Sequence, residues 1–210
     1  MAGSLQESTE TRDLLRRVQG GDRTALEALF ARHRSCIRRY IELRLDNRVR
    51  GRADASDVVQ ETQLEAYRRL PDFLERRPMP FRLWLFRTAY ERVLKTRRYH
   101  LDTRRRAVAR EVALPEESSI VLAAQLLGSA SAPDARMDRQ EVARLVRKSL
   151  GELSELDQEI LLMRSFEGLS NQEVAEVLQI EPATASQRFG RALLRLRKVL
   201  LASGLMGLEG

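Results

Sequence analysis

The sequence holds a single cysteine, Cys36, and only two histidines, His33 and His100, among its 210 residues. One cysteine excludes a disulfide framework and any metal site built from several thiolates. The two histidines lie too far apart to form the closely spaced ligand pair of a typical zinc site. We therefore predict no metal and no other cofactor, and we interpret Cys36 and His33 as packing residues.

The chain also lacks the short motifs of several enzyme classes. The patterns GxxxxGK[ST], GxGxxG and GxSxG are absent. No catalytic set of a nucleophile, a general base and a residue that orients the base can be assembled from the sequence. The most apolar segment, residues 120–127, is too short to span a bilayer. The N-terminal region carries Glu7 and Glu10 and has no apolar signal-peptide segment. These absences predict a cytoplasmic, non-enzymatic protein with no catalytic residues and no membrane insertion.

Proline is scarce, and its six positions predict where breaks between helices fall. Residues 1–70 and 134–181 contain none and show helical periodicity, whereas no segment alternates like a strand. We predict an all-α fold of two small helical domains, residues 1–106 and 139–210, joined by a linker over 107–138. The expected helices cover 13–19, 22–45, 57–70, 81–106, 120–127, 141–150, 154–166, 170–178 and a last segment from 182.

Positive charge is concentrated in the first half of the chain. The formal net charge is +7, with +10 in residues 1–106 and −3 in residues 107–210. Such an excess indicates a polyanionic partner. Within it, the segment 82–106 interleaves cations with aromatic residues, a pattern suited to phosphates and unpaired bases. Packing in the core remains the alternative for each of the aromatic residues Trp84, Phe86 and Tyr90.

The last two predicted helices have the pattern of a helix-turn-helix. Ser170 and Glu173 form a capping box, a short turn follows, and Pro182 occupies the first position of the final helix. The N-terminal part of that helix would enter a major groove. A helical hairpin with a solvated charged face remains the alternative. The side chains suited to base edges and phosphates are Thr184, Ser186, Gln187, Arg188, Arg191 and Arg195.

An acidic and amide cluster interrupts the basic half of the chain. Four polar residues would share the outer side of a helix that buries Val58, Val59 and Ala66; they are Asp57, Gln60, Glu61 and Glu65. Such a cluster suits a positively charged protein partner. Stabilisation of the helix N-terminus by acidic side chains is the competing explanation.

With these motifs in view, the chain resembles a bacterial RNA polymerase sigma factor of the extracytoplasmic function (ECF) type. Residues 54–62, DASDVVQET, are similar to the region two signature of that family. Residues 81–89, FRLWLFRTA, are similar to its promoter-melting helix. Residues 166–178, FEGLSNQEVAEVL, are similar to the first half of its region four helix-turn-helix.

The resemblance implies a promoter-specificity subunit that binds core RNA polymerase and promoter DNA. Residues 1–106 would be a four-helix region two domain, and residues 139–210 a region four domain. Polymerase binding would use Asp54, Asp57, Gln60 and Glu61. Recognition of the minus-ten element as single-stranded DNA would use Arg76, Arg77, Phe81, Trp84, Arg87, Glu91, Lys95, Arg97 and Arg98. Recognition of the duplex minus-thirty-five element would use Thr184, Ser186, Gln187, Arg188, Arg191 and Arg195.

Three positions depart from the family pattern. Glu91 stands where the family usually has Asn, so base choice at minus ten is expected to differ. Ser186 stands where Lys is common, which removes one phosphate contact and is expected to weaken or redirect promoter reading. Gln179 stands where the turn usually has Gly, so it must accept a left-handed or adjusted conformation.

Other functions remain open at this stage. A helix-turn-helix regulator that acts without replacing sigma would need no polymerase, and an adaptor that sequesters another protein would need no DNA. The resemblance also implies an anti-sigma factor or a kinase as regulator.

Overall fold

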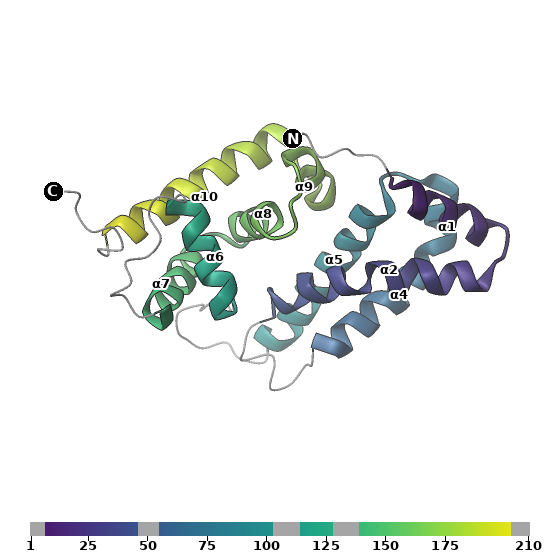
Figure 1. Ribbon diagram of the computed structural model, residues 1–210, viewed down its shortest axis with the longest axis horizontal. Helices are drawn as coiled ribbons and strands as arrows, with labels where there is room; N and C mark the ends of the chain where they lie inside the picture. The colour runs from purple at the N-terminus through teal and green to yellow at the C-terminus, as the bar shows by residue number, and fades with distance from the viewer. Residues whose placement is uncertain (1–6, 46–54, 103–113, 128–138, 203–210) are drawn as a thin grey trace. The chain divides into compact units, whose positions relative to one another are not determined.

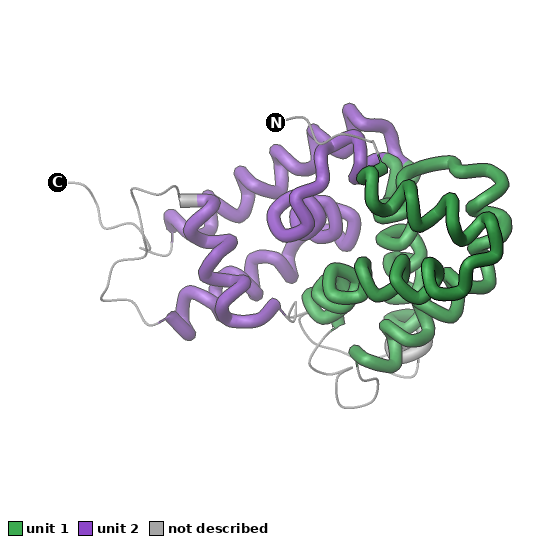
Figure 2. The backbone as a smooth tube through the Cα atoms, turned by 45° about the vertical axis from the view of Figure 1, so that its right-hand side comes forward, with its two compact units in different colours: residues 1–105, 176–179 green, residues 106–175, 180–210 purple. Residues whose placement is uncertain are grey.

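The computed structural model describes residues 7–45, 55–102, 114–127 and 139–202, with side chains up to Arg98 in the second of these ranges. All regular structure within these ranges is α-helical, as predicted. The helices are labelled in Figure 1, and Figure 2 shows in different colours the two compact units into which the chain divides. Unit 1 contains α1, α2, α4 and α5, and unit 2 contains α6, α7, α8, α10 and residues 171–175 of α9.

In unit 1, helix α2 (Arg23–Glu42) packs against α1 (Thr9–Gln19), α4 (Ala55–Arg76) and α5 (Phe81–Asp102). Helix α1 begins four residues earlier than predicted because the Ser8 side chain caps it, accepting from the Thr11 N–H. The Asp22 carboxylate caps α2 as expected, accepting from the N–H groups of Thr24 and Ala25. The Thr24 hydroxyl also donates to this carboxylate, and that hydrogen bond, followed by the one from the Ala25 N–H, lowers the pKa of Asp22 well below its usual value.

Helix α4 differs most from the sequence prediction. We expected a helix to Leu70 and a loop over 71–80, yet α4 continues through Pro71 to Arg76. Proline removes the N–H that would bond to the Tyr67 carbonyl. Pro71 and Tyr67 are both exposed, so water can hydrate that carbonyl, while buried Phe73 anchors the final turn to the core. The loop between α4 and α5 is thereby shortened to residues 77–80.

Aromatic rings form the centre of unit 1. Phe81 is fully buried, with ring centroids 5.3 Å from His33, 5.4 Å from Phe73 and 5.5 Å from Trp84. Because Phe81 opens α5, this cluster fixes the start of that helix against α2 and α4.

Unit 2 is built around α10 (Pro182–Ala202), which packs against α6 (Glu116–Leu127), α7 (Arg139–Gly151) and α8 (Glu155–Ser165). Helix α6 falls in the segment expected to link the domains. Its buried side chains Leu122, Ala123 and Leu126 pack in unit 2 instead, because α6 contacts α7 and α10. The described part of the predicted linker is therefore structured.

The turn between α9 (Asn171–Leu178) and α10 has the predicted construction. Ser170 donates its N–H to the Glu173 carboxylate, and the Ser170 hydroxyl accepts from the Glu173 N–H. Gln179 adopts a left-handed backbone with φ 54°, as expected at this position. The Ile180 N–H then donates to the Ala175 carbonyl, which ends α9 in a Schellman arrangement.

Candidate functional surfaces

The first surface, the acidic face, lies on α4 and consists of Asp57, Gln60 and Glu61. All three side chains are exposed, whereas Val58 and Val59 between them are buried. Asp54, predicted to join them, lies outside the described residues. The structure therefore brings three of the four predicted polymerase-binding residues onto one side of one helix.

Two exposed apolar residues extend the acidic face along α4, and sequence reasoning missed them. Leu64 is 56% exposed and Tyr67 is 57% exposed. They follow Gln60 by four and seven residues, so they continue the same helical stripe. Their spacing of four and seven residues from Gln60 is the feature of the sequence that could have predicted this extension. An apolar centre beside polar groups is the composition of a protein-binding surface.

The ion-pair chain connects α4 to α5. Arg92 lies 3.4 Å from Glu61 and 3.7 Å from Glu65, and Arg69 lies 2.7 Å from both Glu65 and Glu91. Arg87 completes the chain at 3.5 Å from Glu91. The hydrogen bond from Arg69 to Glu91 raises the pKa of the Arg69 guanidinium. Glu91, the unusual acid of the predicted melting helix, therefore has two cations as neighbours.

The predicted minus-ten residues differ in accessibility. Phe81 is fully buried and Trp84 is 9% exposed, so neither presents a ring face to a base in this structure. Their place in the aromatic cluster explains the difference, because the apolar spacing of α5 faces the core. Arg97 donates to the Arg44 carbonyl at 2.7 Å. The predicted cations with exposed side chains are Arg76, Arg77, Lys95 and Arg98, and Arg87 is partly exposed.

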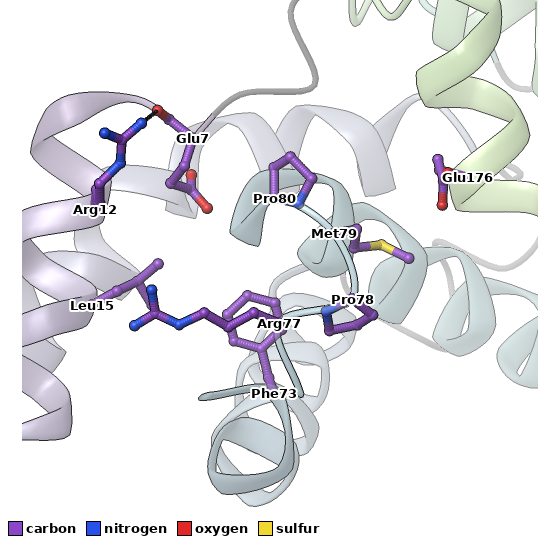
Figure 3. A pocket seen from close by; sticks show the side chains of 9 residues that line it. All are labelled: Glu7, Arg12, Leu15, Phe73, Arg77, Pro78, Met79, Pro80 and Glu176. Atoms are coloured by element: carbon purple, nitrogen blue, oxygen red, sulfur yellow. Dashed lines mark hydrogen bonds between the residues drawn. The ribbon is translucent and has the colours of Figure 1, made fainter. Parts of the chain in front are cut away.

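The α4–α5 loop, residues 77–80, lies beside the N-terminal segment of unit 1. Side chains from both line a pocket (Figure 3), among them Glu7, Arg12, Arg77 and Met79. Figure 3 shows the Arg12 guanidinium contacting Glu7, where its Nη2 donates to the backbone carbonyl at 3.2 Å. Neither Arg12 nor a role for Glu7 at this loop could be predicted from the sequence, because their proximity to the loop depends on tertiary packing.

The duplex-facing candidates all lie on α10. Ser186, Gln187, Arg191 and Arg195 are exposed, and Thr184 is half-buried. The opposite side of the helix buries Ala185, Ala192, Leu196 and Leu200. The structure thus gathers the polar residues on the outer side of the second helix of a helix-turn-helix.

Arg188 is the exception among them because it already has a partner. Its Nη1 donates to Asp157 Oδ1 at 2.9 Å, with 38% of the Arg188 side chain exposed. Asp157 belongs to the first turn of α8, where its N–H donates to the Ser154 hydroxyl. In the structure without DNA, Arg188 is therefore held in an ion pair with Asp157, and a contact with DNA would have to compete with that pair.

No group of three His, Cys, Asp or Glu residues in the described ranges could hold a metal ion. None of the described helices combines the length and apolarity needed to cross a membrane.

Comparisons with known proteins address the family. Residues 29–104 match the model described as Sigma-70 region 2, and residues 143–196 match Sigma-70, region 4. The RNA polymerase sigma-H factor of Pseudomonas aeruginosa is 30% identical over 91% of this chain and 94% of its own. The ECF RNA polymerase sigma-E factor of Haemophilus influenzae is 28% identical over 90% of this chain and 94% of its own.

A comparison with solved structures gives a result consistent with these sequence matches. CnrH in complex with the cytosolic domain of CnrY is similar with a TM-score of 0.57 and 27% identity, over 92% of this chain and 98% of that one. The region 2 match lies within unit 1, and most of the region 4 match lies within unit 2. The similarity to whole relatives covers about nine-tenths of the chain, with 91% for the Pseudomonas aeruginosa protein. The chain therefore belongs to the sigma-70 family, as an alternative RNA polymerase sigma factor of the ECF type that acts in transcription initiation.

Proposed function

We propose that the acidic face of α4 is the polymerase-binding surface of this sigma factor. Asp57, Gln60 and Glu61 are exposed on a rigid helix, and Leu64 and Tyr67 add apolar area beside them. Charges at the rim steer a basic partner, while apolar side chains supply contact energy. The shared exposure of these five residues is the observation that carries the proposal.

The remaining surfaces are assigned to promoter DNA. The α4–α5 loop and the exposed cations Arg76, Arg77, Lys95 and Arg98 meet the minus-ten element as single strands. Flipping a base costs a few kcal/mol, so a loop with a fixed conformation is favoured. Phe81 and Trp84 support this surface from the core. The outer residues of α10 meet the duplex minus-thirty-five element.

The domain roles follow from these assignments. Residues 1–106 bind core polymerase and open the promoter, and residues 139–210 read the upstream element, with α6 packed against them. The protein carries out no chemistry of its own and works in the cytoplasm. A regulatory protein that covers one of these surfaces is the proposed partner, since the related CnrH was solved bound to the cytosolic domain of CnrY.

Run-off transcription tests the whole assignment. The full chain is mixed with core RNA polymerase and a library of promoter fragments, and the transcripts are sequenced. We expect transcripts from a subset of fragments that share two sequence elements. Duplex binding without any transcript would overturn the proposal and favour a helix-turn-helix regulator that acts without replacing sigma.

A further inference from the structure

The α4–α5 loop is held at both ends by the N-terminal segment and α1. Arg77 lies at the start of the loop, and Phe81 follows its end. Each is bonded to a residue more than fifty positions earlier in the chain, Gln19 and Glu7 respectively. Neither anchor residue belongs to α4, α5 or the loop.

The first anchor holds a strained position. Arg77 is not glycine, yet its backbone has φ 39°, in the left-handed region that is strained for an ordinary residue. The Arg77 N–H donates to the Phe73 carbonyl at 2.8 Å, and its Nη2 donates to Gln19 Oε1 at 2.8 Å. Gln19 Nε2 in turn donates to the Leu74 carbonyl at 3.2 Å. One amide side chain therefore ties the end of α4 and the start of the loop to α1.

The second anchor closes the other end. The N–H of Phe81 is among the donors at the start of α5 that have no partner within the helix. Glu7 Oε2 accepts from it at 2.6 Å. Arg12 fixes the Glu7 backbone by donating to its carbonyl (Figure 3). The Phe81 ring is fully buried, so the backbone that Glu7 caps is itself immobilised.

Between the anchors the loop has few free torsions. Pro78 and Pro80 each have φ fixed near −65°, which leaves Met79 as the one residue between them with an ordinary backbone. A segment fixed before binding loses less conformational entropy when a ligand arrives. It can also distinguish ligands that differ by one group, because its contacts cannot readjust.

We infer that Glu7 and Gln19 are positioning residues that set the base selectivity of the α4–α5 loop. The inference rests on the proposed function, in which this loop meets unpaired minus-ten bases. The loop contacts the base, and the two anchors act through it. Loss of an anchor leaves a loop that still reaches DNA but accepts several bases.

The test uses the full chain assembled with core RNA polymerase. The probe is a pool of templates with a pre-opened bubble, randomised on the non-template strand over the minus-ten segment. Sequencing the transcripts gives the preference for each base at each position. The pre-opened bubble removes the cost of melting, so the readout is selectivity and not duplex opening.

The variants separate positioning from folding. Glu7→Ala and Gln19→Ala should each reduce the preference for the best base about three- to tenfold, the scale of one lost hydrogen bond. Glu7→Gln retains the acceptor for the Phe81 N–H and should restore most of it. Gln19→Glu retains the acceptor for Arg77 but loses the donor to the Leu74 carbonyl, so it should restore only part of it. Total transcript yield and core polymerase affinity should change less than twofold. Glu10→Ala, an exposed change on α1, is the matched control and should behave as the parent chain.

The variant Met79→Ala distinguishes failure of the inference about the anchors from failure of the proposed role of the loop. If it alters base preference while both alanine anchor variants leave the preference unchanged, the anchors do not position the loop. If it leaves the preference unchanged, or the parent shows no preference, the loop does not read minus-ten bases. The proposed role of the loop then fails, and the inference with it. Full loss of selectivity in Glu7→Gln would also overturn the inference, since that variant keeps the acceptor and the loss would indicate general disorder of unit 1.

Discussion

Replacing His33 with glutamine should remove a pH-dependent part of the stability of unit 1. His33 is only 8% exposed and lies against the Phe81 ring. Burial lowers its pKa from 6.5 to about 4, and the nearby cations Arg32 and Arg82 act in the same direction. Its Nε2 lies 3.4 Å from the hydroxyl oxygen of Thr11, so the neutral ring has a polar neighbour while the charged ring has two repelling ones.

The magnitude follows from proton linkage. The unfolded chain takes up a proton at His33 near pH 6.5, whereas the folded chain does so only near pH 4. Between these values the unfolded state binds more protons, so stability falls as the pH falls. At about 1.36 kcal/mol per pH unit, the whole interval is worth roughly 3 kcal/mol. The stability contribution is fully present above pH 6.5.

Tryptophan fluorescence isolates the unit concerned. Trp84 is the single tryptophan of the sequence and lies in the aromatic cluster beside Phe81. Urea unfolding at pH 7, 6 and 5 should show the free energy of unfolding falling by roughly 2 kcal/mol in the parent. In the His33→Gln variant most of this fall should disappear. An equal pH dependence in both proteins would refute the reasoning, since the proton would then bind elsewhere.

Three further predictions concern the other surfaces. Asp57→Arg should weaken core polymerase binding at least tenfold by placing a cation against a basic partner. Glu27→Arg, which likewise replaces an exposed acid with arginine but on α2, should not weaken it. Equal losses of affinity in a binding titration would refute the assignment of polymerase binding to the acidic face. Arg188→Ala should reduce the free energy of binding to the selected duplex by about 1–3 kcal/mol, and to other duplexes by less. Asp157→Ala should raise the affinity for unrelated duplexes. If Arg188→Ala weakens binding equally on all sequences, Arg188 contacts a phosphate and not a base. Gln179→Gly should stabilise the turn between α9 and α10 and raise the free energy of unfolding measured by calorimetry by about 0.5 kcal/mol, because glycine adopts φ 54° without strain. A decrease would show that the turn is not strained.

Local signals predicted much of the fold. The capping box at Ser170 and Glu173 and the left-handed turn at Gln179 depend on neighbours within a few residues, so the sequence suffices to place them. Pro71 was misleading because its tolerance inside α4 depends on the exposure of the Tyr67 carbonyl region and the burial of Phe73, which only the packed structure determines.

The candidate functional surfaces likewise combine features that local sequence signals predict with contacts that only tertiary packing determines. Exposure of the acidic face followed from helical spacing around Val58 and Val59. The bond from Phe81 to Glu7 spans 74 residues, and the pair of Arg188 with Asp157 spans 31. No periodicity relates such positions, so the partners of the predicted DNA-facing residues could not be predicted from sequence pattern.

The ion-pair chain has a consequence for how strongly added salt weakens promoter binding. A cation that meets a DNA phosphate gains affinity by releasing condensed counterions, with log K falling by about 0.9 per contact for each tenfold rise in salt. Arg69, Arg87 and Arg92 already face carboxylates, so a phosphate that approaches them displaces few mobile ions. The salt slope should therefore follow exposed cations such as Arg76 and Lys95, and be shallower than the basic content of unit 1 suggests. Part of the positive charge that marks this chain serves to hold two helices together.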